Sequence, residues 1–215
     1  MTRRGATPAG SWHREYSNVP GNYYDKYNAA NPVARYLMRG FFKSFDRLAD
    51  RTSVGSAYEV GCGEGHLSLR LFDRGWDVRG SDLESGPIEQ ANARAVARGA
   101  GPVFDVADLY ELDPDVVAND LVICCEVLEH LPDPHRALAI LTRMARPYLL
   151  LSVPDEPLWR ILNVCRARYL RNFGNTPGHI QHWSTRAFLD LLSRYTQIVA
   201  HEKPLPWTMV LCRCE

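Results

Sequence analysis

A glycine-rich turn constrains the fold of this chain more than any other feature of its sequence. Residues 59–65 read Glu-Val-Gly-Cys-Gly-Glu-Gly, after a short apolar run at residues 56–60 and before an amphipathic segment that begins at Leu67. Glycines between a parallel strand and a helix let a ligand approach the backbone closely and aim free N–H groups at it. We therefore predict a strand–turn–helix unit whose turn binds a ligand.

From about residue 54 onward, short apolar runs alternate with helical patterns, which is typical of βαβ units around a parallel sheet. We predict strands at residues 56–60, 76–80, 103–106, 121–125, 148–153, 197–202 and 207–213, and helices from residue 67 to Gly75 and at residues 86–98, 134–145, 157–171 and 185–195. The run at 121–125 is apolar throughout, as expected for a central strand covered on both faces. The sequence thus predicts a Rossmann-like, doubly wound, seven-stranded α/β sheet, mostly parallel, with an antiparallel terminal hairpin at its edge and helices on both faces.

The length of 215 residues suits one α/β domain. We expect residues 51–215 to form the ligand-binding domain, with an inserted cap helix and loop at about 155–183. Residues 1–50 are expected to be a tail followed by one or two lid helices, because residues 15–50 carry apolar periodicity. We expect these helices to lie over the binding edge of the sheet.

Charge and cysteine content exclude several classes of protein. The 25 basic and 25 acidic residues balance, which argues against a dedicated duplex-binding protein, although a local basic patch stays open. No apolar run approaches the roughly 18–20 residues that span a bilayer, and none of signal-peptide length follows the basic N-terminus. The six cysteines lack CxxC spacing and several lie in predicted core strands, so we expect buried free thiols in a cytoplasmic protein without a membrane partner.

The spacing of the glycines separates two classes of cofactor. Dinucleotide-binding turns use GxGxxG, which would require glycine at position 66, where this chain has His66. The observed spacing is GxGxG, with Glu59 two positions before the first glycine. S-adenosylmethionine (SAM) has no pyrophosphate and carries an ammonium group, so a carboxylate is useful beside it. We expect the turn to receive the methionine part and the ribose of SAM.

In this turn the chain resembles the class I SAM-dependent methyltransferases, and the resemblance continues at that family's intervals. In the family, an acid after the second strand accepts hydrogen bonds from both ribose hydroxyls, and Asp82 stands at that place. A third-strand acid lies near the adenine amino group, where Asp108 fits. The resemblance implies that SAM is the cofactor and S-adenosylhomocysteine the product. The residues it assigns to the cofactor are Glu59, Gly61, Cys62, Gly63, Gly65, Asp82, Leu83, Asp108, Leu109 and Cys125.

The fourth and fifth strands narrow the resemblance to one branch of that family. Two segments are similar to sequence motifs of the branch that includes the ubiquinone-biosynthesis O-methyltransferases. They are residues 120–134, which contain Cys-Cys-Glu-Val-Leu-Glu-His at 124–130, and residues 149–154. The chain lacks the Asn/Asp-Pro-Pro-aromatic motif of enzymes that methylate nucleobase amino groups, and no cysteine follows a proline as in cytosine C5 enzymes. The resemblance therefore implies a small-molecule acceptor methylated on oxygen.

Three histidines are the catalytic candidates. A base is needed only if the acceptor loses a proton, as a hydroxyl would. His130 follows the fourth strand at the edge where ligands bind in open α/β folds, and His179 and His182 lie in a loop expected to return over that edge. His130 could instead form a structural hydrogen bond, and the loop histidines could serve surface or capping roles.

A metal and an anionic acceptor are two further hypotheses. Glu126, Glu129 and His130 with a loop histidine superficially match the metal-binding pattern of small-RNA 2′-O-methyltransferases, and all three could share one helical face. The same sequence motif occurs in family members that need no metal, so we expect no metal ion here. Arginines at 160, 168 and 171 could hold an anionic acceptor or form a solvated face, and a tyrosine within residues 23–27 could line the pocket mouth.

Two other functions stay open at this level. One is an RNA- or protein-directed methyltransferase with the same cofactor site, although the neutral charge makes a nucleic-acid partner the weaker expectation. The other is a SAM-binding module that regulates without transferring methyl, because cofactor binding and catalytic competence are separate properties. The sequence sets neither the acceptor nor the oligomeric state.

Overall fold

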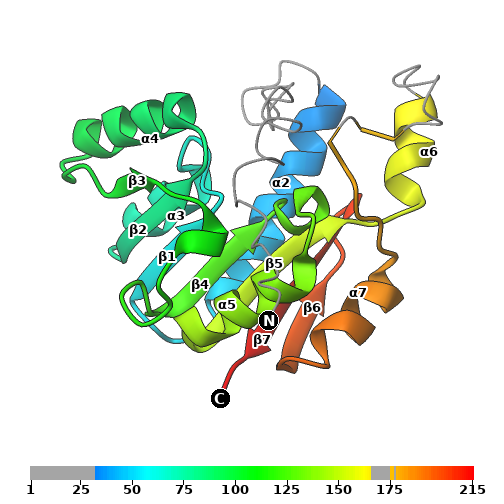
Figure 1. The fold of residues 1–215 in the computed structure, drawn as a ribbon. Coiled ribbons are helices and arrows are strands. Elements are labelled where there is room, and N and C mark those ends of the chain that lie inside the picture. Colours follow the sequence, from blue (N-terminus) through cyan, green and yellow to red (C-terminus); the bar gives the residue numbers. More distant parts are fainter. Residues whose placement is uncertain (1–31, 166–174, 177) are drawn as a thin grey trace, which may run out of the picture.

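The protein folds around one mixed β-sheet, seen in a computed structural model that describes residues 32–165, 175–176 and 178–215 (Figure 1). The strands follow the order β3-β2-β1-β4-β5-β7-β6 across the sheet. They are β1 (Ser56–Val60), β2 (Asp77–Asp82), β3 (Phe104–Val106), β4 (Asn119–Cys125), β5 (Ala145–Pro154), β6 (Gln197–Glu202) and β7 (Trp207–Arg213). The predicted seven-stranded sheet is confirmed.

Helices flank the sheet and short turns follow two of its strands. They are α2 (Pro32–Ala49), α3 (His66–Phe72), α4 (Ser85–Ala97), η1 (Leu109–Glu111), η2 (Leu128–His130), α5 (Pro134–Met144), α6 (Leu158–Cys165) and α7 (Thr185–Leu192). Within the described part of the chain, no helix combines the length and the apolar character that a membrane crossing requires. The inserted helix predicted at 157–171 is described from Leu158 to Cys165, and its predicted remainder lies outside the described residues.

The strand order creates the place where a ligand can bind. From β1 the chain winds outward through β2 to β3 and then returns to β4 on the other side of β1, with all these pairs parallel. Such a reversal opens a crevice outside the carboxyl ends of the strands. β7 pairs antiparallel with both β5 and β6, so the terminal hairpin is antiparallel as predicted, although only β6 forms the edge.

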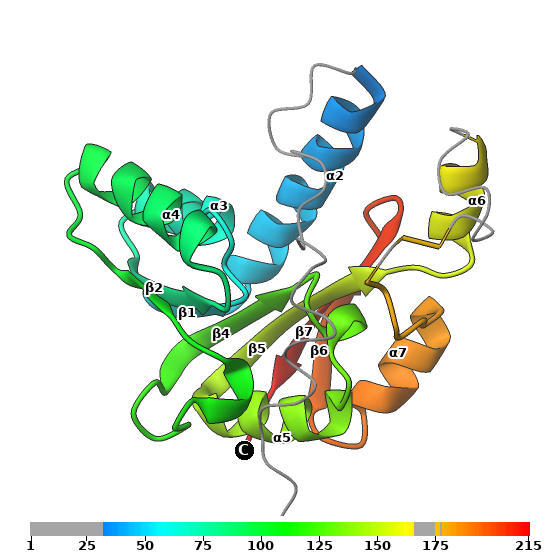
Figure 2. The same ribbon diagram turned by 45° about the horizontal axis from the view of Figure 1, so that its top comes forward.

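Helices cover both faces of the sheet, as predicted (Figure 2). The α2, α3 and α4 helices lie on one face, and α5 and α7 on the other. Because side chains alternate along a strand, Leu121, Ile123 and Cys125 of β4 join the core beneath α2 and α3. Val122 and Cys124 join the core beneath α5 and α7. This two-sided burial explains why the strand reads as a continuous apolar run.

The carboxyl-terminal half of helix α2 packs on a face of the sheet, and the predicted position of this region over the binding edge stays a prediction. Phe45 and Leu48 are fully buried in the core that α2 shares with α3. The Arg70 guanidinium of α3 donates two hydrogen bonds to the Asp46 carboxylate, at 2.7 and 2.5 Å, which ties the two helices together. The amino-terminal end of α2 projects away from the sheet, and Tyr36 there is 72% exposed (Figures 1 and 2).

We expect Phe45→Ala to lower the free energy of unfolding by about 3–5 kcal/mol, because it leaves a cavity in a packed core. Tyr36→Ala, in the same helix but exposed, should change it by less than about 0.5 kcal/mol. Urea denaturation of both variants measures the difference. Equal effects would mean that α2 does not pack on the sheet as described.

Candidate active site

The glycine turn between β1 and α3 has a backbone that other residues adopt only under strain. The φ angles of Gly61, Gly63 and Gly65 are +70°, +52° and +75°, in the left-handed region. A Cβ atom added at Gly61 would lie 2.3 Å from Cγ2 of Val127, which follows β4. The turn and the segment after β4 therefore touch, and the glycine is required for that approach.

The amides of the turn are paired within the protein, contrary to the expectation that they aim freely at a ligand. The N–H groups of Gly61 and Cys62 both donate to the carbonyl of Ser81, at 2.8 and 3.0 Å. The N–H of Gly63 donates to Oδ2 of Asp82 at 2.8 Å. The turn is thus bonded to the end of β2. At these positions the glycines let a ligand approach the backbone closely, but their N–H groups are already paired within the protein.

Three acids stand at the carboxyl ends of β1, β2 and β3. Asp82 joins the glycine turn to β2, and Leu83 beside it is 59% exposed. At the end of β3, Oδ1 of Asp108 accepts a hydrogen bond from the N–H of Tyr110 at 2.9 Å and caps η1. The structure therefore places Glu59, Asp82 and Asp108 along one edge of the sheet, in the order that the sequence predicted.

Glu59 is buried and holds the start of α3. Its Oε2 accepts hydrogen bonds from the backbone N–H and the hydroxyl of Ser68, at 2.9 and 2.5 Å. Burial raises the pKa of the Glu59 carboxyl to about 7; the Ser68 hydrogen bonds oppose this shift, and the charge of Asp82 adds to it. This carboxyl therefore changes its charge near neutral pH.

The apolar residues assigned to the cofactor are mostly core residues. Cys62, Leu109 and Cys125 are 6%, 6% and 8% exposed, each in a different core cluster. Burial raises the pKa of the Cys125 thiol well above its ordinary value, which favours the protonated thiol over the nucleophilic thiolate. The structure shows these three side chains packed in the core, and their contact with a cofactor stays a prediction.

Arg94 of α4 braces the glycine turn, a contact that sequence reasoning missed. Its guanidinium donates to the backbone carbonyl of Glu64 at 3.2 Å and forms an ion pair with the Glu64 carboxylate. The same group lies 2.9 Å from Nε2 of His66. No motif marks this arginine, because its partners lie 30 and 28 positions earlier in the chain.

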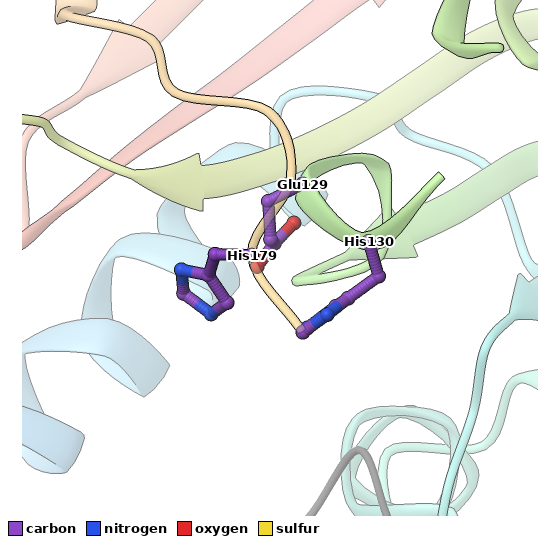
Figure 3. A group of neighbouring side chains, drawn as sticks. All are labelled: Glu129, His130 and His179. Carbon is purple, nitrogen blue, oxygen red and sulfur yellow. The ribbon is translucent and has the colours of Figure 1, made fainter. Parts of the chain in front are cut away.

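Beyond the end of β4, Glu129 and His130 of η2 meet His179 of the loop that precedes α7 (Figure 3). One ligand atom from each residue lies within 4.8 Å of those of the other two. The imidazole rings of His130 and His179 meet edge to face with centroids 4.9 Å apart. Nδ1 of His130 lies 3.0 Å from the carbonyl of Gly178, which joins η2 to the loop.

Two residues proposed for the same chemistry lie elsewhere. His182 is exposed, and its Nε2 lies 2.9 Å from Oδ1 of Asn175, so the structure does not bring it to His130 and His179. Partial desolvation, with help from the positive Arg160, lowers the pKa of the His182 imidazole.

Glu126 precedes η2 with φ +60°, so it does not share a helical face with Glu129 and His130 as the sequence suggested. Its carboxylate accepts hydrogen bonds from the Ser152 hydroxyl at 2.9 Å and from Nε1 of Trp207 at 2.5 Å.

Comparison with known proteins agrees with this geometry. A family model described as a methyltransferase domain matches residues 58–151. A ubiquinone biosynthesis O-methyltransferase of Methylococcus capsulatus is 30% identical over 182 residues, which cover 76% of this chain and 72% of that protein.

Two solved structures share the fold. The PH0226 protein of Pyrococcus horikoshii has a TM-score of 0.67 at 18% identity, covering 94% of this chain and 99% of its own. Magnesium protoporphyrin IX methyltransferase of Synechocystis with bound S-adenosylhomocysteine has a TM-score of 0.64 at 21% identity, covering 95% and 92%. The chain is a SAM-dependent methyltransferase and belongs to the class I family, in the branch that contains the ubiquinone biosynthesis O-methyltransferases.

Proposed function

We propose that this methyltransferase transfers the methyl group of SAM to a hydroxyl oxygen of a small molecule. The observation that carries the proposal is the 2.8 Å hydrogen bond between the Gly63 amide and Asp82, which brings an acid from the second strand against the glycine turn. A carboxylate in that position suits the ribose hydroxyls, since a carboxylate accepts hydrogen bonds strongly. The name of the Methylococcus relative supports oxygen as the methylated atom.

In this proposal SAM lies along the carboxyl ends of β1, β2 and β3. The methionine part rests on the turn of Gly61, Cys62, Gly63 and Gly65, with its ammonium group toward Glu59. The ribose lies on Asp82, and the adenine lies between the exposed Leu83 and the segment of Asp108 and Leu109. Cys125 packs beneath the cofactor from the end of β4.

The acceptor lies on the side of η2 and the loop that contains His179. The methyl carbon leaves the sulfonium, the electron pair of the broken S–C bond stays on sulfur, and the acceptor oxygen forms the new C–O bond. The hydroxyl proton must leave as that bond forms. The Gly178 carbonyl accepts a hydrogen bond from Nδ1–H of His130, so in the neutral imidazole Nε2 is the unprotonated ring nitrogen and can act on the acceptor hydroxyl. His182 has a different place, at the outer rim of the loop.

We further propose that the acceptor is anionic and that the protein works in the cytoplasm. Arg160 is half-buried near Glu156 and His182, so it is not part of a freely solvated face. Arg168, Arg171 and residues 23–27 lie outside the described residues. Five described cysteines are buried free thiols, which suits a reducing compartment.

The proposal is tested by incubating a metabolite extract with the enzyme and SAM carrying a labelled methyl group. We expect label in a small molecule, in a methyl ether that resists mild base, and increasing with enzyme concentration. Label found only in protein or RNA, or on nitrogen or sulfur, would contradict the proposed acceptor class. Labelled SAM incubated with the same extract in the absence of the enzyme is the control.

Asp82→Ala should weaken SAM binding about 100-fold, because two hydrogen bonds to a charged group are lost, at about 1.5 kcal/mol or more each. Asp77→Ala removes the same side chain from the opposite end of β2, where it is exposed, and should leave the affinity unchanged. Calorimetric titration with SAM compares the two variants. Similar affinities in both would remove Asp82 from the cofactor site.

SAM affinity should rise as pH rises from 6 to 7.5, by roughly five- to tenfold, because the Glu59 carboxyl has a pKa of about 7. Below that pKa the group is protonated and neutral and attracts the ammonium group of SAM weakly. Above it, the carboxylate is fully charged. Glu59→Gln should flatten this dependence while the protein still folds. An unchanged pH profile in the variant would show that Glu59 does not face the ammonium group.

A further inference from the structure

We propose that Glu129, His130 and His179 form a binding site for a divalent transition metal ion of the zinc type. The sequence led us to expect no metal, and its pattern pointed to Glu126 as a ligand. The geometry keeps Glu129 and His130 of that pattern, selects His179 as its loop histidine and leaves Glu126 out (Figure 3). The site itself depends only on these residues, whereas its catalytic role rests on the proposed function.

The three side chains are close enough to share one ion. Their ligand atoms lie within 4.8 Å of one another. Ligand atoms of a tetrahedral zinc ion lie about 3.3 Å apart at bond lengths of about 2.0–2.1 Å. Side-chain rotations that shorten the distance between two ligand atoms from 4.8 Å by roughly 1.5 Å would therefore bring them to this spacing. Glu129 is 2% exposed and His179 is 7% exposed, so an ion would be largely shielded from water on their side.

Neighbouring groups orient both imidazoles, and His130 is held in the way that metal-binding histidines usually are. A metal-binding imidazole commonly donates its second ring N–H to a carbonyl or carboxylate, which fixes its tautomer. Nδ1 of His130 meets the Gly178 carbonyl at 3.0 Å, so Nε2 is the nitrogen that can coordinate. The His179 ring stacks on Trp159 with centroids 6.0 Å apart and planes at 26°.

The loop is bonded firmly to η2, which holds His179 beside its two partners. The N–H groups of Ile180 and Gln181 both donate to the carbonyl of Glu129, at 2.9 and 3.0 Å. The Gln181 side-chain amide also donates to the carbonyl of Leu131 at 3.2 Å. These bonds attach the backbone on the C-terminal side of His179 to the backbone of a second ligand, so the set is preorganised before an ion arrives.

The donor set selects the class of ion. Two imidazole nitrogens and one carboxylate suit zinc, iron, cobalt or manganese, whereas magnesium favours a shell of oxygen ligands. Glu126, the additional oxygen donor that the sequence suggested, is directed to Ser152 and Trp207. With three protein ligands, the ion keeps coordination positions for an exogenous oxygen.

The position of the site gives the ion a role at the acceptor. Val127, which touches Gly61 of the cofactor turn, lies two and three residues before Glu129 and His130. With an ion bound, Nε2 of His130 would be a ligand and no longer the base of the metal-free site. The ion would take the acceptor hydroxyl as a further ligand and lower its pKa, so that its proton passes to water. The resulting oxygen then receives the methyl carbon as the S–C bond breaks and its electron pair stays on sulfur.

The test uses the full chain, freed of metal with a chelator and titrated with cobalt(II) in the absence of SAM and acceptor. Cobalt bound by imidazole nitrogen in a site of low coordination number gives intense visible absorption bands. We expect one equivalent to bind and zinc(II) to displace it. His179→Ala and Glu129→Gln should each weaken cobalt binding at least about tenfold, since even residues that only orient a ligand have effects of that size.

Two control variants define the ligand set. Glu126→Gln and His135→Ala, the latter an exposed histidine of α5 hydrogen-bonded to Tyr195, should bind cobalt like the wild type. Absence of cobalt bands in the wild-type protein would overturn the proposal even if a variant fails to fold. Equal binding in His179→Ala and Glu129→Gln, or loss of binding in Glu126→Gln, would also overturn it. Separate SAM titrations of the metal-free protein test the cofactor site, so failure of one proposal is distinguishable from failure of the other.

Discussion

The close contact between Gly61 and Val127 organises the functional edge of this protein. A Cβ atom at Gly61 would lie 2.3 Å from the valine, so only a glycine in the left-handed region lets β1 and β4 bring their following segments together. The Gly63 amide bonds to Asp82 and draws the end of β2 to the same place. These two contacts of the glycine turn bring the ends of β1, β2 and β4 together. In the proposed function, the cofactor lies on one flank of this contact, and Glu129 and His130 lie on the other.

The two flanks of this contact consist of different chemical groups. The cofactor flank consists of acids at strand ends and a turn whose amides bond within the protein, so it offers charge and close approach. The flank proposed for the acceptor is a cluster of imidazoles and a buried carboxylate, held by the loop that bonds to the backbone of Glu129. This division suits the proposed transfer to a hydroxyl, because the sulfonium is already activated and the protein has to orient the acceptor and remove its proton.

The sequence predicted the strands and the turn well, because those features depend on local pattern. Apolar runs and prolines defined the last two strands, and glycine spacing identified the turn. Partners that come from distant segments carried no such signal, which is why the contact of Arg94 with Glu64 was missed. The loop histidines show the same limit: His179 and His182 look equivalent in sequence, yet the backbone at Gly178, with φ +90°, places only His179 beside His130.

A crystal structure of the protein with S-adenosylhomocysteine tests the account most directly. The account predicts the amino acid part over the turn at 61–65, the ribose hydroxyls on the Asp82 carboxylate, and the sulfur atom facing the cluster of Glu129, His130 and His179. Product bound away from this edge of the sheet, or bound there with its sulfur atom facing away from that cluster, would contradict it.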